Sequence, residues 1–215
     1  MTALLRYVAA DSLRAERWAA PVLLFLGATA AFNADEGGDA LACYGFTAAV
    51  LLPVAVWLTV AVSNSEDPVQ QDVTAVTVGG ALRVRLAKLW CAAILCVVLA
   101  IGALIWSPVA GNPDRPSWVV AGAAAHAITL VAGVAIGAVL SRPVVTRLSI
   151  VVFGATLALL LELALPIPPL RPMLTLFDAD HPGALAWPLT AIAAETVVLA
   201  AALIAVAHRV ARHRT

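Results

Sequence analysis

The chain has 215 residues, of which 62% are hydrophobic and 12% charged, and its mean hydropathy is +0.96. Because soluble domains average roughly half apolar and a quarter charged residues, this composition excludes an ordinary soluble domain and indicates an integral membrane protein. The formal net charge is zero, which by itself favours neither an acidic nor a basic partner.

The first 17 residues are predicted to form an amphipathic helix on the inner face of the membrane. A helical wheel places apolar residues on one side and basic residues elsewhere; these are Leu5, Val8, Ala9 and Leu13 against Arg6, Arg14 and Arg17. The n-region of a signal peptide is the alternative, but the segment is long and contains Asp11 and Glu16. Trp18 is then expected to mark the membrane interface.

Six apolar stretches are long enough to cross the bilayer, which requires about 20 residues in a helix. They cover residues 18–34, 41–62, 89–109, 117–140, 148–166 and 187–207. Turn-forming residues separate them, among them Gly37-Gly38, Asp67-Pro68 and Arg142-Pro143. The predicted fold is an all-α membrane protein with one transmembrane domain.

The distribution of Arg and Lys between the loops predicts the orientation. With the N-terminus inside, eleven basic residues face the cytoplasm and two face outward. The inner residues are Arg6, Arg14, Arg17, Arg83, Arg85, Lys88, Arg142, Arg147, Arg209, Arg212 and Arg214, and the outer ones are Arg115 and Arg171. Both termini are therefore expected in the cytoplasm. Because all but one of the basic residues are Arg, we expect a bacterial plasma membrane.

The longest polar interruption covers residues 63–88 and is predicted to be cytoplasmic. Its first half is acidic and amide-rich, and its second half carries Arg83, Arg85 and Lys88, which we expect to anchor the third span at the anionic inner leaflet. On the outer side, residues 166–186 are too rich in proline for a continuous helix but too apolar for a solvated loop. A partly buried hairpin or short helices are predicted there.

Two carboxylates lie within the predicted spans, Glu162 near the outer end of the fifth and Glu195 inside the sixth. A charge at the bilayer centre costs roughly 2.5–3.5 kcal/mol, so such a group needs a partner, water or a proton. A role in a translocation path, a structural hydrogen bond and proton coupling all remain open for Glu195. Glu162 is close enough to the interface to be solvated by the outer loop.

His126 lies in the fourth span on a face of small residues. Gly122, Thr129, Gly133 and Gly137 share that face, and small residues at this spacing let helices approach closely. We interpret His126 as a buried hydrogen-bonding residue rather than a metal ligand. A loop cluster of His181 with Asp178 and Asp180 is a weak candidate for binding a cation.

Several catalytic signatures are missing. The sequence has no phosphate-binding loop, no zinc-protease motif and no nucleophile elbow. The three cysteines, Cys43, Cys91 and Cys96, do not form a disulfide pattern. We therefore expect a non-catalytic chain that binds no cofactor or metal of its own.

The order of these parts resembles that of permease subunits of type-2 ATP-binding-cassette exporters. The similarity extends over nearly the whole chain: an amphipathic N-terminal helix, six spans, a long inner connection after the second span and a broken outer segment before the sixth. Residues 77–90, TVGGALRVRLAKLW, are similar to the Gly-rich, then basic, entry into the third span of such permeases.

The resemblance implies that residues 66–77 hold a coupling helix that docks on a separate ATPase. The polar docking contacts would be Glu66, Asp67, Gln70, Gln71 and Asp72, with residues 4–17 as the adjacent connecting helix. It also implies two ATPase copies carrying ATP and Mg²⁺, and a second permease subunit, identical or different. No nucleic-acid partner is expected. The short outer loops leave little surface for a large hydrophilic substrate, so the expected cargo is an apolar or amphipathic compound such as a drug, antibiotic, peptide or lipid.

Two other functions remain open at this point. An ion-coupled secondary transporter would use Glu195 together with Glu162, although no inverted repeat is visible. The second alternative is a membrane scaffold that transports nothing. An intramembrane enzyme is disfavoured because His126 and the two carboxylates are dispersed along the sequence.

Overall fold

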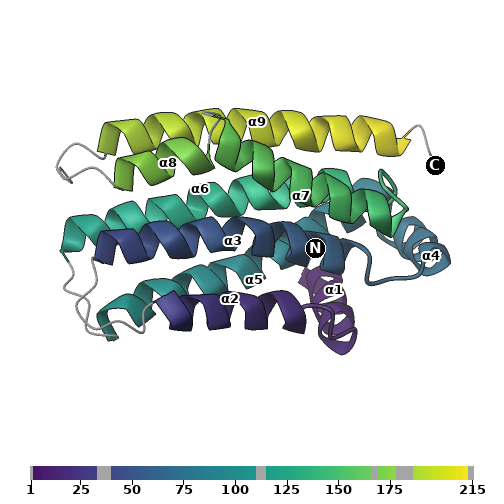
Figure 1. Ribbon diagram of the computed structural model, residues 1–215. Helices are drawn as coiled ribbons and strands as arrows, with labels where there is room; N and C mark the ends of the chain where they lie inside the picture. Colours follow the sequence, from purple (N-terminus) through teal and green to yellow (C-terminus); the bar gives the residue numbers. More distant parts are fainter. Residues whose placement is uncertain (1, 33–39, 110–114, 166–168, 178–185, 213–215) are drawn as a thin grey trace.

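The structure, a computed structural model, describes residues 2–32, 40–109, 115–165, 169–177 and 186–212. Throughout these ranges the regular structure is α-helical (Figure 1). In chain order the helices are α1 (Thr2–Arg14), α2 (Ala19–Phe32), α3 (Ala40–Ser63), α4 (Pro68–Val78), α5 (Ala81–Val109), α6 (Pro116–Leu140), α7 (Leu148–Ala164), α8 (Leu170–Phe177) and α9 (Ala186–Arg212).

Four of these helices are long and apolar enough to cross a membrane, namely Ala40–Ser63, Ala81–Val109, Pro116–Leu140 and Trp187–Ala211. This is the pattern of a multi-pass membrane protein. The other two predicted spans coincide with the shorter apolar helices α2, of 14 residues, and α7, of 17. At a rise of 1.5 Å per residue these are about 21 and 26 Å long, less than the roughly 30 Å of hydrocarbon. Six spans, and their orientation, therefore stay predictions.

The third span differs from the prediction at its start. We expected an apolar helix from Leu89, whereas α5 begins at Ala81. The break lies just before it, at Gly79 and Gly80, whose φ angles of 81° and 142° are ones that residues with side chains rarely adopt. Between Ala81 and Leu89 there is no further breaker, so the basic turn continues directly into the apolar helix.

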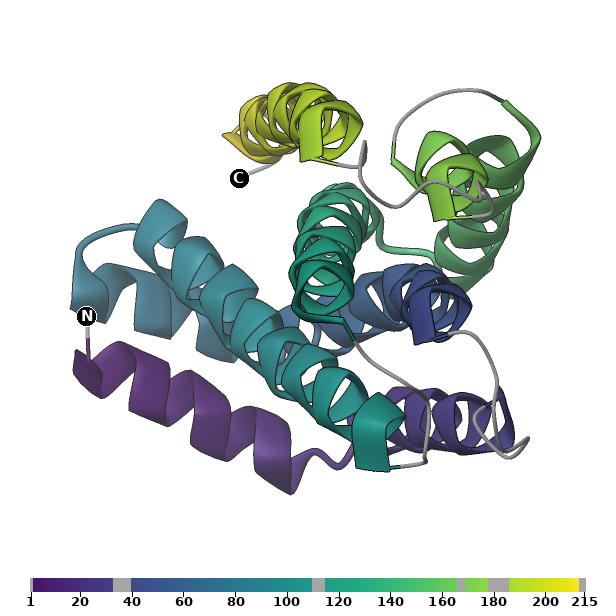
Figure 2. The same cartoon turned by 90° about the vertical axis from the view of Figure 1, so that its left-hand side faces the viewer.

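The long helices form a bundle around α3 and α6. In Figure 2, α6 lies between α9 and α5, while α7 and α8 lie to the side of α9. Apolar clusters join α3 to α6, α8 and α9 on one side, and to α2 and α5 on the other. Helix α1 packs Leu4 and Val8 against Ala87 and Cys91 of α5, near the end of the bundle that carries α4 (Figure 1).

The predicted small-residue face of α6 is where α3 packs most closely. A Cβ atom added at Gly133 would lie 2.6 Å from the Cβ of Ala55 and 2.8 Å from the carbonyl oxygen of Leu52, and one added at Gly137 would lie 2.6 Å from the Cβ of Thr59. Gly122 is packed against the Tyr44 ring in the same way. Backbone-to-backbone contact between α3 and α6 therefore depends on these glycines.

Gly133→Ala is expected to destabilise the bundle by about 1–3 kcal/mol, because the added methyl group must push two helix backbones apart. The matched control is Gly102→Ala in α5, where an added Cβ meets nothing within 4 Å. Thermal melting curves of the two variants, recorded in detergent, measure the difference in melting temperature. Equal melting temperatures would show that the α3–α6 contact is not tight.

The segment that the sequence predicts on the outer side contains the short helix α8. Leu170, Met173 and Phe177 of α8 are buried in the core cluster shared by α3, α6 and α9. A partly buried short helix is thus present, as the sequence predicted. Asp178, Asp180 and His181, the candidate cation cluster, lie outside the described residues.

Candidate functional site

Helix α4 is a short helix that is capped at both ends by residues next to it in sequence. The Asp67 side chain accepts a hydrogen bond from the backbone N–H of Val69 at 2.9 Å, and Pro68 occupies the first turn. At the other end Gly79 adopts the left-handed conformation and donates to Val76 O, and the Gly80 N–H donates to Ala75 O at 2.8 Å. Isolated helices this short are marginal in water, so these caps give α4 its defined ends.

None of the 11 residues of α4 is buried. Val69, Val73 and Val76 are 72%, 62% and 84% exposed, and their spacing of four and three residues places them on one helical face. We call this the valine face. The sequence signal for this face is the i, i+4, i+7 spacing of the three valines, which was not among the predicted docking contacts because those were all polar.

One flank of α4, next to the valine face, is held to α1 and to the preceding turn by polar contacts. Gln70 Nε2 donates to the hydroxyl oxygen of Tyr7 in α1 at 2.6 Å, and Thr74 Oγ1 donates to Glu66 Oε1 at 3.3 Å. Burial, together with the Glu66 carboxylate, raises the pKa of Tyr7. Its hydroxyl therefore stays protonated at neutral pH and can act as both donor and acceptor between α1 and α4.

A buried ion pair lies beneath α4, where α3 ends and α5 begins. Lys88 Nζ is 2.7 Å from Glu66 Oε2, and the two side chains are 2% and 1% exposed. Lys88 Nζ also lies 3.3 Å from the carbonyl oxygen of Ser63, the last residue of α3. Among the described residues this is the one salt bridge within 4.0 Å.

This ion pair corrects two expectations. Glu66 was expected as an exposed docking contact and Lys88 as an anchor facing lipid, but each side chain is enclosed by protein and neutralised by the other. The physical reason is the turn at residues 64–67, which brings Glu66 back beneath α4 and next to Lys88 on the first turns of α5.

The remaining predicted docking residues have different surroundings. Asp67 is exposed but caps α4, Gln70 is exposed but contacts Tyr7, and Gln71 is half-buried. Asp72 is exposed beside the valine face. The surface of α4 is therefore apolar at its centre with acidic and amide groups around it, rather than polar throughout.

The two predicted arginine anchors bind protein carbonyl groups. Arg83 donates to Val78 O at the end of α4 at 2.9 Å. Arg85 donates to Ala207 O in α9 at 2.8 Å and to Ala138 O in α6 at 2.9 Å. Cations near the last carbonyls of a helix are favourable. Arg85 therefore ties the start of α5 to the last turn of α6 and to α9, five residues before α9 ends.

The three residues predicted to line a path or to join the apolar helices, His126, Glu162 and Glu195, lie apart from one another. His126 in α6 is buried, and its Nδ1 lies 2.7 Å from Gly122 O. Glu195 is exposed on α9, and Glu162 is half-buried on α7. No hydrogen bond between described residues links the three. In the part of the chain that the structure describes, no group of three or more His, Cys, Asp or Glu residues could hold a metal ion.

No family model, curated protein or solved structure matches the chain. A functional conclusion therefore depends on the geometry of the chain itself. The strongest features are a capped, exposed helix with an apolar face, and the buried ion pair that joins it to the bundle.

Proposed function

We propose that the chain is the permease subunit of an ATP-driven exporter of the type-2 ATP-binding-cassette class, moving an apolar or amphipathic compound outward. The energy would come from a separate ATPase subunit that binds α4. The chain itself would hydrolyse nothing, and ATP with its Mg²⁺ would be held by two copies of that partner.

The valine face of α4 is the observation that supports this proposal. Three exposed valines on one short helix form an apolar patch, and such patches mark interaction sites. Asp67 and Asp72 lie beside them, and α4 carries no Lys or Arg. An anionic membrane surface is therefore an unfavourable partner. A soluble protein with an apolar groove and a basic rim is complementary to this face.

The contacts around α4 explain how movement of such a partner could reach the bundle. A displacement of α4 would pass to α5 through the Glu66–Lys88 pair and the Arg83 hydrogen bond to Val78 O. Arg85 connects the same turn of α5 to α6 and α9. Small shifts at such a joint can be converted into rotation of packed helices.

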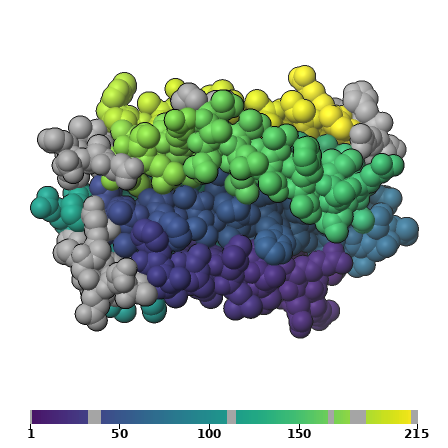
Figure 3. Space-filling model, in the orientation of Figure 1, coloured from purple at the N-terminus to yellow at the C-terminus, as the bar shows by residue number. Residues whose placement is uncertain are grey.

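A second permease subunit would complete the membrane part. Helix α7 has Val151 as its only buried residue, while Phe153, Leu157 and Leu160 are exposed. It lies at the surface of the face shown in Figure 3. A helix so weakly covered by its own chain is suited to pairing with another permease, identical or different, in a bacterial plasma membrane.

Co-expression tests the proposal directly. The chain is expressed with the ATP-binding-cassette ATPases encoded by neighbouring genes and purified in detergent through a tag on the permease. We expect one ATPase to co-purify in stoichiometric amounts, and its ATP hydrolysis to depend on the permease. If none of the co-expressed ATPases is retained on the permease, the proposal is contradicted.

A further inference from the structure

A cavity of about 310 Å³ lies between α6, α7 and α9. Its walls are almost entirely apolar, and its one ionisable residue is Glu162. The lining residues are Ile136, Val139 and Leu140 from α6, Gly154, Ala158, Leu161 and Glu162 from α7, and Leu203 from α9. The volume is at the lower end of the range of about 300–1,000 Å³ that is typical of small-molecule sites.

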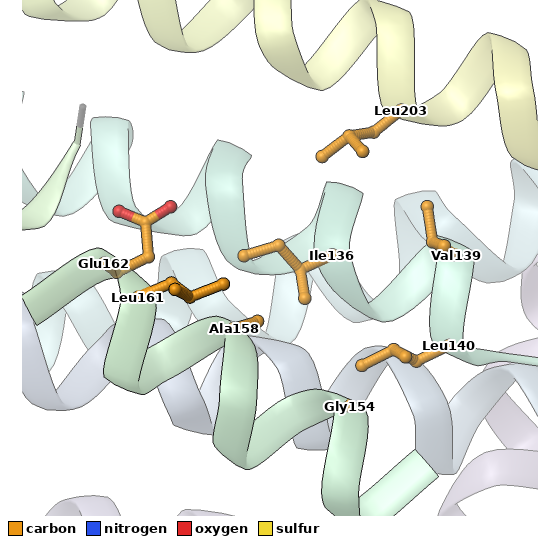
Figure 4. Close-up of a pocket in the computed structure, with 8 residues that line it drawn as sticks. All are labelled: Ile136, Val139, Leu140, Gly154, Ala158, Leu161, Glu162 and Leu203. Atoms are coloured by element: carbon orange, nitrogen blue, oxygen red, sulfur yellow. The ribbon is translucent and has the colours of Figure 1, made fainter. Parts of the chain in front are cut away.

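The Glu162 carboxylate points away from α7 into the space that faces α6 and α9 (Figure 4). Its Oε2 accepts one long hydrogen bond, 3.4 Å, from the backbone N–H of Leu170. No described Lys, Arg or His lies within ion-pair distance of it. Arg171, next to Leu170 in sequence, instead donates to the carbonyl oxygen of Ala164.

An unpaired carboxylate beside an apolar cavity selects the charge of what it binds. Ionised and alone, Glu162 is costly, because apolar surroundings replace the water that would solvate it. A cation placed against it removes that cost, and the attraction is stronger than in water because the local dielectric constant is lower. An anion would be repelled, and a neutral acyl chain would leave the carboxylate unneutralised.

We infer that this cavity binds a lipophilic cation, with its apolar body between α6, α7 and α9 and its positive charge beside Glu162. Only the further step, that such cations are the compounds exported, rests on the proposed function. Binding itself requires neither ATP nor a partner ATPase.

The test uses octyltrimethylammonium, an apolar chain with a permanent positive charge, and octyl sulfate, its anionic counterpart. Each is titrated calorimetrically into the purified chain in phosphatidylcholine nanodiscs, with empty nanodiscs subtracted. Wild type is expected to bind the cation and not the anion. Glu162→Gln is expected to raise the Kd for the cation by at least about tenfold, because it removes the charge and keeps the shape.

Two further variants complete the experiment. Glu195→Gln removes the other intramembrane carboxylate, which does not line the cavity, and should leave the Kd unchanged. Ala158→Leu fills the cavity without changing its charge and should also weaken cation binding, so the inference can be tested even if Glu162→Gln is unstable. Equal binding by wild type and Glu162→Gln, equal binding of the two probes, or an effect of Glu195→Gln alone would overturn it. Failure to retain an ATPase would contradict the proposed function and leave this result unaffected.

Discussion

Replacing Lys88 by Met is expected to lower the free energy of unfolding by about 3–5 kcal/mol, because the Glu66 carboxylate then stays buried without a positive partner. The Lys88 Nζ to Glu66 Oε2 distance is 2.7 Å, and both side chains are almost fully buried. Water therefore cannot take the place of either charged group if the other is removed. Unfolding in mixed micelles, followed by circular dichroism, measures the loss.

The double variant Glu66→Met with Lys88→Met separates a lost interaction from an unpaired charge. With both groups apolar, no buried charge remains, so stability is expected to return to within about 1–2 kcal/mol of wild type. Arg14→Met, which removes an exposed cation on α1, serves as the control and should change little. If Lys88→Met costs no more than Arg14→Met, the ion pair does not hold the joint between α3, α4 and α5.

Val73→Asp should weaken partner binding while leaving the fold intact. Val73 is central in the valine face and 62% exposed, so the folded chain alone tolerates a charge there. In a docked complex the new carboxylate would be buried in an apolar groove, and a central contact of this kind is worth roughly 2 kcal/mol or more. We therefore expect an affinity loss of at least about tenfold, measured as retained ATPase and as ATP hydrolysis that depends on the permease.

The conservative variant Val73→Ile provides the matched control, because it keeps an apolar side chain at the same position and should retain the partner. The melting temperature of each variant, measured without the ATPase, shows whether folding has changed. If the Val73→Asp variant retains the ATPase normally and its melting temperature is unchanged, the valine face does not bind the ATPase.

The two experiments address different parts of one device. Under the proposed function, the valine face would determine what α4 contacts, and the ion pair would determine whether α4 moves together with α5. A variant with a broken ion pair that still folds should retain the ATPase through the valine face but transmit less of its motion. Loss of coupling without loss of binding is therefore the expected signature of Glu66 and Lys88.

Hydropathy and spacing were sufficient to predict where the apolar helices lie. The six predicted stretches coincide with six apolar helices, although α5 begins eight residues before Leu89. The glycines that α6 presents to α3, and the burial of His126, were also predictable from a spacing of three and four residues. These features depend on neighbours within one helix, so they can be read from a local pattern.

Only the tertiary structure decided what the polar residues do. Glu66 and Lys88 are 22 positions apart in sequence, and their identities alone predict two exposed charges; the turn after α3 makes them a buried pair. In the same way, Glu162 is one of two similar intramembrane carboxylates by sequence. The packing of α7 against α6 places it at a cavity that α9 lines through Leu203, whereas Glu195 is exposed on α9. The role of a charge depends on what encloses it, and residues distant in sequence supply that enclosure.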